Sequence, residues 1–150
     1  MGMEILIIVL GLLLDRITKI LALKSLYVNG DVVILKNYFA FSYLENRGAA
    51  FGIFQNKVLL LSIVTSIVVL AMIIYLFKYR PKSKFLRISI AMIIAGAIGN
   101  LIDRFVYKFV VDFILVHYKT IYFFPTFNVA DMFVVIGTCL LALSIIRDEI

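Results

Sequence analysis

The sequence predicts an all-α membrane protein with four transmembrane helices, and its composition and four long apolar stretches support this fold class. Of the 150 residues, 64% are hydrophobic and 16% are charged, whereas soluble domains average about 25% charged residues. Too few polar side chains are present to cover a water-soluble globule. A helix needs about 20 apolar residues to cross the hydrocarbon core, and four stretches reach that length. We expect one membrane domain, residues 1–150, with spans at about 5–24, 58–77, 86–104 and 130–147.

The first stretch, 5–24, carries Asp15 and Lys19 inside its apolar run. It lacks the basic flank and small-residue cleavage site of a removable signal peptide, so we expect it to remain as the first span. The two charges are spaced i, i+4 and share one helix face. An ionised side chain near the bilayer centre costs about 2.5 to 3.5 kcal/mol on insertion scales, so each needs a partner or a function. The pair could neutralise its own charges and fix helix packing, or it could help to build a functional site, and the sequence favours both roles equally.

The connection 25–57 combines a strand pattern with a turn-like loop. Apolar and aromatic residues alternate from Val33 to Tyr43 after Asn29 and Gly30, which predicts short strands. The segment 46–52 (NRGAAFG) then precedes the second span. It fits a tight re-entry turn, and its amide and guanidinium groups could equally bind a substrate backbone.

The loop after the second stretch fixes the expected topology. Five of the fifteen basic residues lie between Lys78 and Arg87. Short basic loops stay in the cytoplasm, so both termini should lie inside and the connections 25–57 and 105–129 outside. The net charge of +6 is thus a topology signal, and we expect no nucleic-acid partner.

The third stretch, 86–104, ends in a polar stripe. Gly96, Asn100 and Asp103 follow i, i+4, i+7 and so lie on one face, which must point into the helix bundle because lipid cannot solvate it. Arg104 is long enough either to reach the headgroups or to clamp a carboxylate. The polar groups of spans three and four therefore gather at one membrane face.

Two further carboxylates lie near that face. Asp112 lies in the segment 105–127, which holds nine of the 21 aromatic residues and suits the headgroup boundary. Asp131 opens the fourth stretch, with Asn128 three residues before it on the same helix face. When two carboxylates approach each other at low dielectric they share one proton, which leaves one base and one acid. Aspartic proteases use this arrangement, but intramembrane carboxylates also serve ion-coupled transport.

Five segments in this order resemble the bacterial lipoprotein signal peptidases, also called signal peptidase II, a family of four-helix aspartic proteases. They are 15–19 (DRITK), 46–52 (NRGAAFG), 96–104 (GAIGNLIDR), 110–113 (VVDF) and 127–131 (FNVAD). The resemblance covers nearly the whole chain. Ser42, where threonine is usual, and Met132, where smaller residues are common, depart from the family pattern.

The resemblance implies that Asp112 and Asp131 form a catalytic dyad. It also implies a strand-containing extracytoplasmic β-cradle at 30–44 and an interfacial helix within 105–127. The family removes the signal peptide from diacylglyceryl-modified prolipoproteins by cleaving before the lipidated cysteine. The residues expected to support the site are Asp15, Lys19, Asn46, Arg47, Gly96, Asn100, Asp103, Arg104, Asn128 and Ala130.

We therefore expect a multi-pass protein of the bacterial cytoplasmic membrane with its active site at the extracytoplasmic face. Its partners should be lipid-modified prolipoproteins and membrane lipids, and it should act as a monomer. We expect no cofactor, and no metal because no clustered ligand set is present. The rival functions are a small ion- or proton-coupled transporter and a non-catalytic membrane assembly factor. Transport predicts charges along the whole membrane depth, whereas here they gather at one end.

Overall fold

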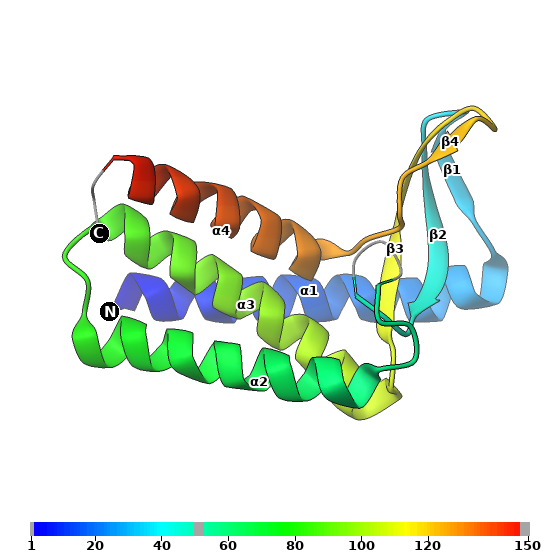
Figure 1. Cartoon of the computed structure of the whole chain (residues 1–150). Helices are drawn as coiled ribbons and strands as arrows, with labels where there is room; N and C mark the ends of the chain where they lie inside the picture. Colours follow the sequence, from blue (N-terminus) through cyan, green and yellow to red (C-terminus); the bar gives the residue numbers. More distant parts are fainter. Residues whose placement is uncertain (1, 50–52, 148–150) are drawn as a thin grey trace.

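The computed structural model describes residues 2–49 and 53–147. Its helices lie lengthwise beside one another, and a small sheet closes one end of the bundle (Figure 1). Residues 50–52 of the NRGAAFG segment lie outside the described residues. The helices are α1 Gly2–Asn29, α2 Val58–Ile74 with a π-helical continuation Tyr75–Tyr79, α3 Lys84–Tyr107 and α4 Val129–Ile146.

Helix α3 is the centre of the bundle, because it packs against α1, α2 and α4. Its buried residues Leu86, Ile90, Ala91 and Ile94 form a core with Leu76. The contact with α4 is very close. A Cβ on Gly96 would collide with the carbonyl oxygen of Ala130, so glycine is what allows the two backbones to approach. This close approach brings the start of α4 to the polar end of α3.

The outer faces of the helices are apolar and uncovered. Leu59 and Ile67 on α2 and Val135 on α4 are 74%, 63% and 60% exposed. Side chains of this kind at this exposure fit hydrocarbon as their solvent. Among the described residues, three helices are long and apolar enough to cross a membrane, Val58–Tyr79, Lys84–Tyr107 and Val129–Ile146. The chain is therefore a membrane protein, as its composition predicts.

The first predicted span, 5–24, lies inside α1, a single helix of 28 residues. At 1.5 Å per residue this helix is about 40 Å long, enough to cross a bilayer. It is not one of the three apolar helices, and it carries Asp15, Arg16, Lys19 and Lys24. The fourth transmembrane helix therefore stays a prediction.

The sheet has four strands in the order β1-β2-β3-β4, with antiparallel neighbours. The strands are β1 Val32–Leu35, β2 Phe39–Asn46, β3 Val110–Tyr118 and β4 Tyr122–Phe123. The predicted strands around 30–44 are thus present. In the central pair, Leu44 lies opposite Asp112 and Asn46 opposite Val110. One face packs on α1 through a cluster that includes Val111 and Phe113.

The interfacial helix predicted within 105–127 is wrong, and the all-α class needs correction to a mostly helical fold with a sheet. Residues 110–118 form the strand β3 instead. The segment is rich in β-branched and aromatic residues, which favour strands when a partner is available. That partner is β2, more than sixty residues earlier in the chain. Aromatic content alone suited the membrane boundary and carried no information about this long-range pairing.

Candidate active site

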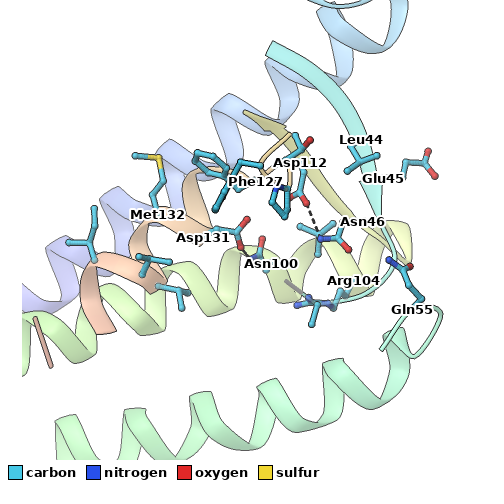
Figure 2. A pocket seen from close by; sticks show the side chains of 18 residues that line it. Leu44, Glu45, Asn46, Gln55, Asn100, Arg104, Asp112, Phe127, Asp131 and Met132 are labelled. Carbon is cyan, nitrogen blue, oxygen red and sulfur yellow. Dashed lines mark hydrogen bonds between the residues drawn. The ribbon is translucent and has the colours of Figure 1, made fainter. Parts of the chain in front are cut away.

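A pocket of about 680 Å³ opens where the sheet meets the bundle. Asp112 from β3 and Asp131 from α4 both line it, and Figure 2 shows them with Asn46 and Asn100 between the sheet and the helices. The pocket has a polar side and an apolar side. The polar lining comprises Glu45, Asn46, Gln55, Asn100, Arg104, Asp112, Thr126 and Asp131, and the apolar lining includes Phe124, Phe127, Met132, Val135 and Ile136.

Asp112 is held by two side-chain amides. It is 1% exposed. Its Oδ2 accepts a hydrogen bond from Nδ2 of Asn46 at 2.9 Å, and its Oδ1 accepts one from Nδ2 of Asn128 at 2.6 Å. Burial raises the pKa of Asp112 to about 7, and the negative charge of Asp131 adds to this effect. The carboxyl can therefore hold a proton near neutral pH.

Asp131 belongs to the first turn of α4, where it forms a capping box with Asn128. Asn128 Oδ1 accepts from the backbone N–H of Asp131, and Asp131 Oδ2 accepts from the backbone N–H of Asn128, both at 3.0 Å. Asp131 Oδ1 accepts from Nδ2 of Asn100 at 2.7 Å. Asn128 therefore contacts both carboxylates.

A buried ion network lies behind the pocket. The Asp15–Lys19 contact expected from the i, i+4 spacing is present at 3.0 Å, and Lys19 Nζ also lies 3.0 Å from Oδ2 of Asp103. Arg16 Nη1 pairs with Oδ1 of Asp103 at 2.8 Å. Sequence reasoning missed Arg16, because no acidic residue in its own helix lies three or four positions away. Its partner comes from α3.

This network holds the backbone beside each pocket carboxylate. Asp15 Oδ1 accepts from the N–H of Ala130, the residue before Asp131, at 3.0 Å. Asp103 Oδ2 accepts from the N–H of Val111, the residue before Asp112, at 3.1 Å. The Asp15–Lys19 pair therefore compensates its own charges, and Asp15 also binds the backbone beside Asp131.

The remaining predicted residues have different surroundings. Arg104 lines the pocket and donates from Nη2 to the carbonyl oxygen of Gly48 at 3.3 Å. Arg47 does not line it. The Arg47 guanidinium pairs with Glu45 at 3.1 Å, and its central carbon lies 6.0 Å from the ring centroid of Phe109.

Several pocket residues had no signal in the sequence. Glu45 and Gln55 line the polar side, yet both lie in segments whose pattern indicated only a strand and a loop. The apolar lining from α4 was equally hidden, because a membrane helix is apolar on every face. Met132, noted only as a departure from a pattern, lies in this lining.

The comparisons with known proteins agree over nearly the full length. The model of the family described as "Signal peptidase (SPase) II" matches residues 7–147. The chain is 56% identical to a lipoprotein signal peptidase of Clostridium novyi, with 97% of this chain and 99% of the relative covered. It is 55% identical to the corresponding protein of Clostridium tetani, with 98% and 94% covered. A bacterial membrane enzyme solved by the in meso method at 2.3 Å resolution superposes with a TM-score of 0.89 at 31% identity, covering 99% of this chain and 90% of that one.

Proposed function

Because the chain belongs to the signal peptidase II family, we propose that it removes signal peptides from prolipoproteins by an aspartic mechanism in which Asp112 and Asp131 act as the dyad. The observation that carries the mechanism is that both carboxylates line one pocket and that Asn128 contacts each of them. The alternative functions, an ion-coupled transporter and a non-catalytic assembly factor, are disfavoured because neither predicts membership of a peptidase family.

The surroundings of the two carboxylates favour different protonation states. Each carboxyl accepts two N–H groups, but Asp131 is only half-buried, which suits the ionised base. Asp112 is buried, and its pKa of about 7 suits the partner that keeps the shared proton. On this basis we propose that Asp112 holds the proton of the dyad in the resting enzyme.

The reaction then needs no nucleophilic side chain. Asp131 takes a proton from a water molecule, whose oxygen attacks the scissile carbonyl carbon, while the O–H of Asp112 donates to the carbonyl oxygen. In the gem-diol intermediate, the proton on Asp131 passes to the leaving nitrogen, one gem-diol hydroxyl returns its proton to Asp112, and the carbon–nitrogen bond breaks. The new carboxyl and amine ends depart, and the dyad again holds one proton.

The supporting residues hold these two groups in place. Asn46, Asn100 and Asn128 donate to the carboxylates, while Asp15 and Asp103 bind the backbone beside them. Lys19 compensates the charges of those two aspartates. Gly96 allows α3 to reach Ala130, and Arg104 ties α3 to the loop at Gly48. Arg47 lies outside the pocket and pairs with Glu45, which lines it, so its support is indirect.

The proposed substrate is a diacylglyceryl-modified prolipoprotein, cut just before its lipidated cysteine. Such a substrate presents a membrane-spanning signal helix and acyl chains that stay in the bilayer. The apolar side of the pocket, formed by α4 residues such as Met132 and Val135, fits groups that arrive from lipid. A monomer supplies every residue that the mechanism uses.

The membrane topology follows from the same proposal. Helix α1 begins and α4 ends at the bundle end opposite the sheet (Figure 1), the end where the basic loop 78–87 lies. With α1 as a fourth span, both termini lie in the cytoplasm and the site lies at the extracytoplasmic face of the bacterial cell membrane. We treat residues 1–150 as one membrane domain.

The test is cleavage of a diacylated prolipoprotein peptide by the purified protein in detergent micelles. Asp112→Asn and Asp131→Asn should each lower the rate at least about a hundredfold, because an amide can neither act as the base nor hold the shared proton. Asp31→Asn is the matched control, since Asp31 is exposed and outside the pocket. Substantial turnover by the double variant would refute the dyad, and equal rates on an unlipidated peptide would refute the substrate rule.

A further inference from the structure

Lys19 makes a contact that charge compensation does not require. Its side chain is fully buried, and its Nζ lies 3.0 Å from a carboxylate oxygen of Asp15 and 3.0 Å from one of Asp103. These two anions, with Arg16 on Asp103, already balance its charge. The ammonium group nevertheless donates a third hydrogen bond, at 2.9 Å, to Oδ1 of Asn100.

This contact fixes which way the Asn100 amide points. An ammonium group has three donors and no acceptor, so only the oxygen of the amide can face it. Nδ2 of Asn128 donates to the same oxygen at 3.1 Å. The NH₂ group of Asn100 is therefore turned to Oδ1 of Asp131, 2.7 Å away. In the flipped amide, an oxygen would face the Asp131 carboxylate and an NH₂ group would face Lys19.

The other two amides at the pocket are oriented by the backbone. The N–H of Gly48 donates to Oδ1 of Asn46 at 2.9 Å, and the N–H of Asp131 donates to Oδ1 of Asn128 at 3.0 Å. Each of these amides thus also turns its NH₂ group to a dyad carboxylate. Among the three, Asn100 is the one whose orientation depends on a charged side chain.

We propose that Lys19 is a positioning residue for peptide-bond cleavage, which acts by locking the Asn100 amide so that it donates to Asp131. This inference rests on the proposed dyad. The lock keeps a donor on the base while the base is ionised, and it prevents the flipped amide from repelling it. The other charged groups around this contact are Asp15 and Arg16 on α1, Asp103 and Arg104 on α3, and Asp112 on β3.

Two double variants separate the hydrogen bond from the charge. Asp15→Asn with Lys19→Gln and Asp15→Asn with Lys19→Met both remove one acid and one base, so the net buried charge is unchanged. Glutamine can still donate to Asn100 Oδ1, whereas methionine of similar length cannot. We expect kcat of the methionine variant to be about ten- to a hundredfold lower than kcat of the glutamine variant. This is the expected effect of losing the hydrogen bond from Asn100 to the ionised Asp131. KM for the diacylated peptide and the thermal unfolding midpoint in detergent should be similar in both.

Equal kcat values for the two double variants would overturn the lock. The dyad would still stand in that case, because its own test is the loss of activity in Asp112→Asn and Asp131→Asn. A difference in the unfolding midpoint that matched the difference in kcat would also overturn it, since Lys19 would then act on stability alone.

If the double variants do not fold, a single variant tests whether the side chain at position 100 must donate to Asp131. Asn100→Asp keeps an oxygen for Lys19 but replaces the donor to Asp131 by a second oxygen. The rate relative to wild type should be low at pH 8 and should recover as the pH is lowered, because the protonated introduced carboxyl again donates to Asp131. A rate ratio that does not change with pH would overturn the inference.

Discussion

Nδ2 of Asn128 lies 2.6 Å from Oδ1 of Asp112, across the gap between the start of α4 and strand β3. Through its capping box, the same residue also exchanges two hydrogen bonds with Asp131. One asparagine thus combines a structural role at a helix end with a role at the proposed acid. The two roles can be separated by substitution.

Asn128→Ser should keep the helix but lose most of the activity. Serine caps a helix N-terminus as well as asparagine does, but its side chain is too short to reach Asp112. We expect an unfolding midpoint close to that of wild type and a cleavage rate lowered about ten- to a hundredfold. Asn128→Ala is the comparison, because it should add the loss of a cap, about 1 kcal/mol of stability. Full activity in the serine variant would show that the contact with Asp112 is dispensable.

The pH–rate profile should fall on the alkaline side of neutrality. Burial and the nearby Asp131 charge raise the pKa of Asp112 to about 7, so its proton is present below that pH and is lost above it. The mechanism needs this proton, and we expect the initial rate to drop about tenfold per pH unit well above pH 7. The measurement is the cleavage rate from pH 5 to 9 in detergent. A rate that rises through pH 9 would contradict the proton assignment.

The same shift makes stability depend on pH. The folded protein holds the Asp112 proton up to about pH 7, whereas an unfolded carboxyl loses it near pH 4. The folded state therefore binds more protons between these values, and the contribution of Asp112 to the free energy of unfolding falls as the pH rises through that window. Asp112→Asn should remove this dependence in unfolding experiments performed from pH 4 to 8.

Gly96→Ala should damage both stability and activity. The added Cβ would collide with the carbonyl oxygen of Ala130 and lie 2.8 Å from Cγ2 of Val134. A backbone atom cannot rotate away, so α4 must move and carry Asp131 with it. Overpacking of this kind costs about 1 to 3 kcal/mol. Gly2→Ala is the control, because its Cβ would meet nothing within 4 Å, and wild-type behaviour of both variants would contradict the close approach.

Glu4→Gln should lower stability without changing the chemistry. Glu4 is buried in the first turn of α1 and lies 2.8 Å from Nε of Arg87 at the start of α3. Neither residue lines the pocket. Removing one charge of this ion pair should cost about 1 to 3 kcal/mol, seen as a lower unfolding midpoint. The cleavage rate per folded molecule should be unchanged, and a selective loss of kcat would mean that this end of the bundle is coupled to the site.

Residue spacing within each helix predicted several contacts of this molecule, because spacing determines which side chains share a helix face. The spacing of Asp15 and Lys19 predicted their contact, and the stripe of Asn100 and Asp103 predicted an inward face, which both residues confirm by binding Lys19. Contacts between segments far apart in the chain could not be predicted from the sequence. The pairing of β3 with β2, the Arg16–Asp103 pair and the contact of Asn128 with Asp112 depend on how the elements pack. The catalytic roles of Asp112 and Asp131 came from the family resemblance and stay predictions.

The hydrogen bonds from Ala130 to Asp15 and from Val111 to Asp103 also have a meaning for biosynthesis. The first helix supplies one anchor and the third supplies the other, while the last helix carries Asp131. A nascent chain therefore lacks a working site until its final segment has entered the membrane and docked against the earlier ones. Under the proposed mechanism, proteolytic activity begins only once α4 has docked, and a chain that still lacks α4 cannot cut neighbouring peptides.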